Sequence, residues 1–132
     1  MSCFADTSGF LAILDADDLN HASAHRVWEL VNTREEPIFS TNYVVVETVA
    51  LVHHRFGVGT VRRFYEEILG VITLDWVDQS AHFAGLSGVM AAGRSGPSMV
   101  DCISFEYMRR RSLNAAIAFD RHFTDREYRL PS

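Results

Sequence analysis

The sequence contains no lysine, and all twelve of its basic residues are arginine. This absence argues against P-loop nucleotide hydrolysis, Schiff-base chemistry and acyl-phosphate sites, because each of these depends on a lysine side chain. Positive charge is also scarce in the first 50 residues, which carry eight acids and two arginines. The net charge of −5 is unfavourable for non-specific binding of nucleic acid, unless a bound metal ion neutralises some of the acids.

Cysteines and long apolar runs are few as well. Cys3 and Cys102 are the only cysteines and form no C-x-x-C pair, so we expect reduced thiols in or near the core of a cytoplasmic protein. No segment approaches the roughly 18 apolar residues that span a bilayer. Asp6 interrupts the first apolar run, which no basic stretch precedes, so we expect no secretory signal. The length of 132 residues predicts a single domain over residues 1–132.

Short apolar segments alternate with helical segments along the whole chain. Strands are expected at residues 2–6, 38–40, 71–74 and 115–119, with a short fifth at 128–130. Helices are expected at residues 9–14, 21–31, 43–55, 60–69, 79–92 and 98–111. This alternation is typical of an α/β fold in which helices cover both faces of a mainly parallel sheet. Two acids, Asp6 and Asp120, end predicted strands, and ligands of open α/β sheets bind at that edge.

Three acids of this pattern have an ordinary structural explanation. Asp6 and Asp120 can cap the helical turns that follow them. Asp101 lies three residues after Ser98, as in a capping box, and the helix dipole favours an acid in the first turn. None of the three positions, taken alone, indicates a functional site.

Glu47 has no such explanation. It lies in the middle of the helical segment Tyr-Val-Val-Val-Glu-Thr-Val-Ala-Leu-Val, where we expect its carboxylate to be buried. A buried carboxylate without a partner is costly, so it should pair with an arginine, be protonated or bind a metal ion. In a metal-free cluster of four acids at least one carboxyl group should have a raised pKa, and we expect it to be Glu47.

Three acids at strand or helix edges and one helical acid together suit a hard cation. Mg²⁺ and Mn²⁺ prefer carboxylate and water oxygens to histidine or cysteine ligands. Such an ion lowers the pKa of a bound water and stabilises charge on a phosphoryl oxygen. The four acids therefore predict a site for one or two divalent cations that acts on a phosphoryl group.

Four stretches of the chain resemble the signature segments of the PIN domain. They are residues 4–8 (Phe-Ala-Asp-Thr-Ser), 40–48 (Ser-Thr-Asn-Tyr-Val-Val-Val-Glu-Thr), 98–105 (Ser-Met-Val-Asp-Cys-Ile-Ser-Phe) and 118–123 (Ala-Phe-Asp-Arg-His-Phe). Any one stretch is weakly specific. Their order and spacing, over nearly the whole chain, are similar to those of the VapC-type toxins of bacterial toxin–antitoxin pairs.

The resemblance implies a PIN-like three-layer α/β/α sandwich around a central, mainly parallel sheet of four or five strands. It also implies an endoribonuclease that depends on Mg²⁺ or Mn²⁺, with RNA as substrate, a small antitoxin protein as partner and a homodimeric assembly. Carried over by position, the catalytic and metal-binding acids are Asp6, Glu47, Asp101 and Asp120. Thr7 becomes an auxiliary polar residue beside them. Many relatives carry a further acid where this chain has His122, which bears on the occupancy of a second metal.

Other polar residues have a structural as well as a functional interpretation. Arg94, in the glycine-rich loop before Asp101, is the candidate for a phosphate contact, because a guanidinium group matches phosphate geometry. The arginines of residues 109–111 end a helix, where a structural role is favoured over RNA contact. His21 and His25 have helical spacing but no third zinc ligand. The alternative function is a non-catalytic RNA-binding or protein-interaction module on the same fold.

The early helices carry more apolar groups than one small core face needs. We therefore expect an antitoxin to bind there. The side chains concerned are Phe10, Leu11, Leu14, Trp28 and Leu30.

Overall fold

Four short parallel strands form the centre of the molecule. They are β1 (Cys3–Ala5), β2 (Ile38–Thr41), β3 (Thr73–Asp75) and β4 (Ala116–Ile117), in the spatial order β3-β2-β1-β4. This computed structural model describes all residues from 1 to 132. Phe4 pairs with Phe39 on one side and with Ala116 on the other, which aligns the carboxyl ends of three strands at one edge. The predicted parallel sheet is confirmed.

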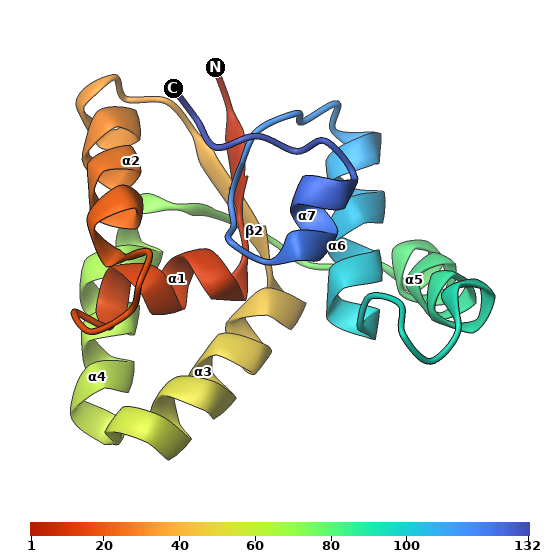
Figure 1. The fold of residues 1–132 in the computed structure, drawn as a ribbon, viewed down its shortest axis with the longest axis horizontal. Coiled ribbons are helices and arrows are strands. Elements are labelled where there is room, and N and C mark those ends of the chain that lie inside the picture. The colour runs from red at the N-terminus through yellow and green to blue at the C-terminus, as the bar shows by residue number, and fades with distance from the viewer.

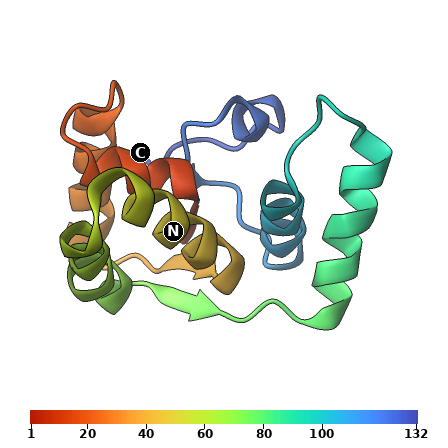
Figure 2. The same cartoon turned by 90° about the horizontal axis from the view of Figure 1, so that it is seen from below.

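Helices cover both faces of this sheet and give the three layers seen in Figures 1 and 2. They are α1 (Thr7–Leu14), α2 (His21–Thr33), α3 (Asn42–Phe56), α4 (Val58–Arg63), a π-helical segment η1 (Phe64–Ile68), a 3₁₀ turn η2 (Leu69–Val71), α5 (Gln79–Ala92), α6 (Met99–Arg110) and α7 (Arg121–Asp125). The first four helices lie on one side of the sheet, and α5, α6 and α7 lie on the other. No helix of the structure combines the length and the apolar character needed to cross a membrane.

The fifth strand does not form as predicted. Residues 128–130 contribute only an isolated bridge, in which the N–H of Ala116 donates to the carbonyl of Arg129 at 2.8 Å. The strand expected over residues 115–119 is also shorter, because the N–H of Phe119 leaves the ladder and donates to a side chain, the Ser8 hydroxyl.

Most of the α-helices begin next to a residue whose side chain caps them. Asp6, Thr41, Asp78, Ser98 and Asp120 each cap a helix with a side-chain oxygen. The helix expected from residue 60 begins earlier than predicted: α4 starts at Val58, after Gly57. Gly57 has a φ of 85°, a conformation that favours glycine, and it ends α3 and starts α4 without a loop between them.

Two glycines allow helices to approach their neighbours closely. A Cβ on Gly9 would lie 2.1 Å from the carbonyl oxygen of Ile117, so only glycine lets the first turn of α1 lie against the end of β4. A Cβ on Gly85 would lie 2.3 Å from Cγ1 of Ile103, so α5 packs directly on α6 through its small residues.

The core lies between β1 and the helices on each face. Its largest fully buried side chains include Phe4, Phe10, Phe64, Phe123 and Ile103. Both cysteines are free and buried, as expected.

The apolar surface predicted on α1 and α2 was wrong in part. Phe10 and Leu14 are buried in the core, because α1 packs between α2 and α3. Leu11, Trp28 and Leu30 are half-buried.

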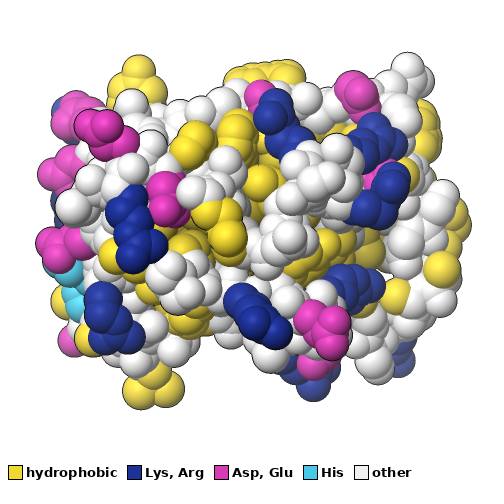
Figure 3. Space-filling view, turned by 90° about the horizontal axis from the view of Figure 1, so that it is seen from above, with side chains coloured by type: hydrophobic (Ala, Val, Ile, Leu, Met, Phe, Trp, Pro, Cys, Tyr) yellow, Lys and Arg dark blue, Asp and Glu magenta, His cyan; other side chains and the backbone are white.

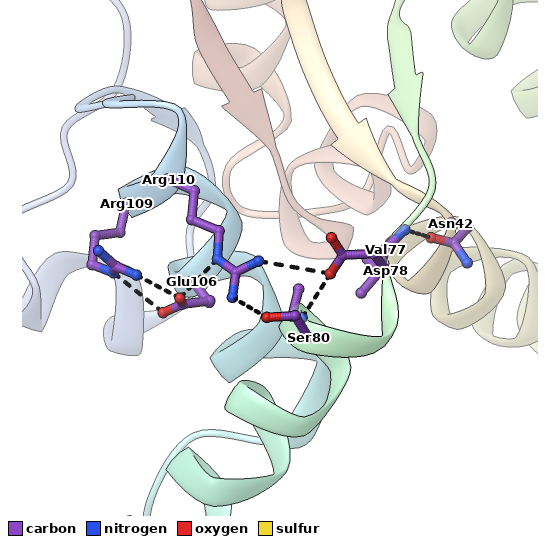
Figure 4. Close-up of polar contacts among 8 residues, drawn as sticks. Asn42, Val77, Asp78, Ser80, Glu106, Arg109 and Arg110 are labelled. Atoms are coloured by element: carbon purple, nitrogen blue, oxygen red, sulfur yellow. Dashed lines mark hydrogen bonds and ion pairs between the residues drawn. The ribbon is translucent and has the colours of Figure 1, made fainter.

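The three arginines at the end of α6 all form ion pairs, and one of them, Arg110, joins α6 to the start of α5. Arg110 donates to Glu106 at 2.9 Å and to Ser80 at 3.0 Å, and it lies 3.6 Å from Asp78 (Figure 4). Arg109 pairs with Glu106 at 2.6 Å. Arg111 pairs with Asp75 at 2.6 Å. A structural role for residues 109–111 therefore explains their charge.

Candidate active site

A cavity of about 310 Å³ opens at the carboxyl edge of the sheet, and all four acids predicted from the sequence line it. β1 leads directly into α1 at this edge and β2 leads directly into α3, which brings two helix starts together (Figures 1 and 2). The lining residues are Asp6, Thr7, Ser8, Leu11, Glu47, Leu51, Ser98, Asp101 and Asp120. Residues separated by more than 100 positions in the chain thus form one acidic site.

Asp6 is the most deeply buried of the four acids, with 3% of its surface exposed. Its Oδ2 accepts from the N–H of Ser8 at 3.2 Å and from the Ser8 hydroxyl at 2.8 Å. Its Oδ1 is buried and has no hydrogen-bond partner. The pKa of Asp6 is raised from 3.8 to about 7. Burial is the main cause and the negative charge of Asp101 adds to it, while hydrogen bonds from Ser8 and Thr7 oppose the rise.

Asp101 is also buried and completes the capping box expected from the sequence. Its Oδ2 accepts from the N–H of Ser98 at 3.3 Å, and the Ser98 hydroxyl accepts from the N–H of Asp101 at 3.1 Å. Burial raises the pKa of Asp101, as does the nearby charge of Asp120, while the bonds from Ser98 and the charge of His122 lower it. Asp120 caps α7 by accepting from the N–H of His122 at 2.8 Å. The capping explanation and the cluster explanation are therefore both true of the aspartates.

Glu47 differs from its prediction. Its side chain is half-buried at the wall of the cavity, so the raised pKa of the buried acid belongs to Asp6 instead. The reason is the orientation of α3, which turns Val44, Thr48 and Val52 into the core and leaves Val46 69% exposed. None of the four acids forms an ion pair, so the alternative of an arginine partner for Glu47 is not realised.

Thr7 lies beside Asp6, as expected, and its hydroxyl joins α1 to α3. It donates to the carbonyl of Val44 at 3.5 Å and accepts from the hydroxyl of Thr48 at 3.1 Å. The sequence reasoning did not single out Ser8, whose hydroxyl contacts Asp6 and the N–H of Phe119. An acid two residues before a serine predicts the local bond to the backbone. Nothing in the sequence indicates the bond to Phe119.

The donor chemistry of the cavity fits a hard divalent cation. The acids offer only oxygen ligands, and the buried Oδ1 of Asp6 lacks the partner that a buried polar atom normally has. No three histidine, cysteine or acidic side chains lie close enough together to enclose a metal ion. An open arrangement of this kind suits Mg²⁺, which keeps several waters and binds through one or two carboxylates.

Two further predicted residues lie outside the acid cluster. His122 is half-buried and follows Asp120, with its charge acting on Asp101. Arg94 is exposed in the turn between α5 and α6 and does not line the cavity, so its phosphate contact stays a prediction. His21 contacts the carbonyl of Ala12 through Nδ1 at 2.7 Å, which supports a structural interpretation of that histidine.

Comparison with known proteins finds similarity to the VapC20 endonuclease, although no family model matches the chain. The 23S rRNA-specific endonuclease VapC20 of Mycobacterium tuberculosis (strain CDC 1551 / Oshkosh) is 27% identical over 122 residues, which cover 92% of this chain and 91% of VapC20. VapC20 of strain ATCC 25618 / H37Rv matches to the same extent. The crystal structure of M. tuberculosis VapC20, described as a Sarcin-Ricin loop cleaving toxin, has a TM-score of 0.84 at 25% identity and covers 96% of this chain and 95% of its own.

The parallel sheet, its helical layers and the acidic cavity at its carboxyl edge match a PIN-like fold. The near full-length likeness to VapC20 in both sequence and structure supports a PIN-domain protein of the VapC type.

Proposed function

We propose that this protein is an endoribonuclease toxin that cleaves RNA phosphodiester bonds with the help of Mg²⁺ or Mn²⁺. The observation that carries the proposal is the acidic cavity, which is lined by four acids that form no ion pair. One of them, Asp6, has a buried Oδ1 without a hydrogen-bond partner. The near full-length likeness to VapC20 supports it, because that relative is named as an endonuclease.

The residues of the cavity would have different roles in this function. One or two of the acids Asp6, Asp101, Asp120 and Glu47 would contact the cation directly, and the others would reach it through bound water. Thr7 would hold the start of α1, next to Asp6, against α3 through its hydroxyl. When bound, the cation supplies an activated water and positive charge for the phosphoryl oxygen. The four acids are free for this role because no arginine neutralises them.

The substrate we propose is ribosomal RNA. VapC20 is named for the 23S rRNA and its structure for the Sarcin-Ricin loop, so this loop is the first substrate to test. The face that carries both termini lies opposite the cavity. On that face arginines and acids are interspersed, so it offers RNA no continuous basic surface (Figure 3). We therefore propose that RNA approaches the carboxyl edge of the sheet. Arg94 stays a candidate for a phosphate contact.

The partners we propose are a small antitoxin and a second copy of the chain. A cavity of about 690 Å³ between α2 and the η1 and η2 segments includes Trp28 in its lining and supports an antitoxin surface on this side of the molecule. The outer side of α5 exposes Phe83 and Met90 and supports self-association.

The test of the proposed function is cleavage of 23S rRNA by the purified wild-type protein with Mg²⁺, with Mn²⁺ and with EDTA. We expect cleavage with either ion and none with EDTA, together with weak, saturable Mn²⁺ binding by calorimetry. RNA binding without cleavage, and without saturable metal binding, would instead identify the alternative, a non-catalytic RNA-binding module on the same fold.

A further inference from the structure

The hydroxyl of Ser8 stands between two acidic segments of the cavity that are far apart in the chain. It contacts Oδ2 of Asp6 at 2.8 Å and the N–H of Phe119 at 2.9 Å. Phe119 directly precedes Asp120, the acid that caps α7. One side chain therefore touches the first acid of the site and the backbone next to the last one.

The direction of these two hydrogen bonds is fixed by chemistry. A backbone N–H can only donate, so the Ser8 oxygen accepts from Phe119. The single hydroxyl proton is then free to point at Asp6, whose ionised carboxylate can only accept. Ser8 thus holds a defined orientation, because rotating the hydroxyl proton away from Asp6 would leave a carboxylate lone pair without a donor.

This arrangement also determines which oxygen of Asp6 is available. The N–H and the hydroxyl of Ser8 both donate to Oδ2, which places the two donors on the same oxygen. Oδ1 remains buried without a protein partner. The carboxylate is therefore held with one satisfied oxygen and one buried oxygen that lacks a protein donor, in a residue that lines the cavity.

The backbone around Ser8 supports the same junction. The N–H of Asp6 donates to the carbonyl of Ile117 at 3.2 Å, and Gly9 lies against that same carbonyl. These contacts set the distance between α1 and the end of β4. Among the hydrogen bonds between the Asp6–Gly9 turn and residues 117–120, the one from Phe119 to Ser8 depends on a side chain, so it can be removed by a substitution that leaves the backbone bonds intact.

We propose that Ser8 is a positioning residue of the metal site: it directs Oδ1 of Asp6 toward the cation and holds the segment that carries Asp120 against Asp6. This inference rests on the proposed metal-dependent function and deepens it. Ser8 acts through Asp6 and Asp120 and need not touch the ion or the RNA itself.

The experiment compares Mn²⁺ binding by wild type, Ser8→Ala and Ser8→Thr, using calorimetry on the full-length protein. Loss of a hydrogen-bonding partner of a metal ligand typically lowers metal affinity about 10-fold to 100-fold, and we expect that range for Ser8→Ala. Ser8→Thr keeps the hydroxyl and should restore most of the affinity. In the metal-free protein, amide hydrogen exchange at Phe119 should be faster in Ser8→Ala than in wild type.

The matched control is Ser104→Ala, which also removes a buried serine hydroxyl. That hydroxyl donates only to the carbonyl of Val100, in its own helix, so the control should bind Mn²⁺ like wild type. A wild-type Mn²⁺ affinity in Ser8→Ala overturns the positioning role, even if the variant is less stable. Absence of Mn²⁺ and Mg²⁺ binding in the wild type is a different result, because it overturns the proposed metal-dependent function itself and the role of Ser8 with it.

Discussion

Each aspartate of the cavity caps a helix, and in the proposed function it has the second task of binding the cation. One oxygen accepts a capping bond from the backbone: at α1 for Asp6, at α6 for Asp101 and at α7 for Asp120. The negative charge is not used in a salt bridge, because none of these groups appears among the ion pairs. Replacement of an aspartate by asparagine should therefore separate the two tasks, since asparagine also caps helices well.

Asp101→Asn should reduce metal-dependent RNA cleavage to background, because the capping oxygen remains and the charge is lost. Its stability in EDTA should be unchanged or higher, since burial and the charge of Asp120 disfavour the ionised form of Asp101. The measurements are an RNA cleavage assay and thermal unfolding in EDTA. Asp125→Asn, an exposed change in α7, is the control and should cleave normally. Wild-type cleavage by Asp101→Asn would remove this residue from the proposed site.

The raised pKa of Asp6 predicts a pH-dependent stability of the metal-free protein. Between pH 3.8 and about 7 the folded protein holds a proton on Asp6 that the unfolded chain has released. Stability should therefore fall as the pH rises through this interval, by on the order of 1 kcal/mol for each step of one in pH, and level off above it. Denaturant unfolding in EDTA from pH 4 to 8 should show this fall in wild type relative to Asp6→Asn. Parallel curves for the two proteins would contradict the buried, protonated state of Asp6.

Much of the site was predictable because local signals mark it. Two of the acids end predicted strands, one belongs to a capping box, and one lies in mid-helix without a structural explanation. All four line the cavity. The burial of Glu47 was wrong because a helix that is apolar on every side does not reveal which face packs inward. Ser8 was missed because its second bond joins residues 111 positions apart.

The packing of helices and strands is limited more by how closely two backbones approach than by the helix propensity of the residue at the contact. Gly9→Ala would place a Cβ 2.1 Å from the carbonyl oxygen of Ile117, so α1 or β4 must shift. We expect a loss of about 1–3 kcal/mol, the usual cost of an added methyl group in a tightly packed position, measured by urea unfolding. The shift would also separate Asp6 from the Asp120 segment and weaken Mn²⁺ binding.

Gly59→Ala is the control for that substitution. A Cβ on Gly59 meets nothing within 4 Å, and the residue lies within α4, where alanine stabilises a helix by up to about 1 kcal/mol over glycine. The two substitutions add the same atom and should act in opposite directions. Equal effects would indicate that the contact between Gly9 and Ile117 does not constrain the fold.

Helix boundaries could be read from the sequence more accurately than strand boundaries. Asp78 and Gly93 delimit α5 over the residues predicted, and Ser98 starts α6 as expected. Strand β4 was predicted too long because its end depends on a tertiary bond, the one from Phe119 to Ser8. The predicted fifth strand does not form, because residue 129 makes only a single bridge to Ala115 and no ladder of paired residues extends from it.

For the molecule as a whole, a further exposed apolar surface lies on α5, outside the region predicted on α1 and α2. Helix α5 contacts α6 on one side and stands outside it, farthest from the sheet (Figure 2). Its small residues, among them Ala81 and Gly85, face α6, while Phe83 and Met90 are 53% and 70% exposed. Phe83 and Met90 are seven residues apart and therefore lie on the same side of the helix. An unpaired apolar side of this kind is typical of an interface between subunits.

We expect the protein to be a dimer that associates through α5. Charged groups cannot be buried in such a contact without partners, so Phe83→Glu should shift the protein to a monomer at micromolar concentration. Light scattering coupled to size-exclusion chromatography measures the mass directly. Tyr65→Glu is the control, because Tyr65 is also an exposed aromatic residue, at 69%, but lies on η1, on the other side of the sheet. The control should remain a dimer. A monomeric wild type would exclude the dimer, and a dimeric Phe83→Glu would place its interface away from this side of α5.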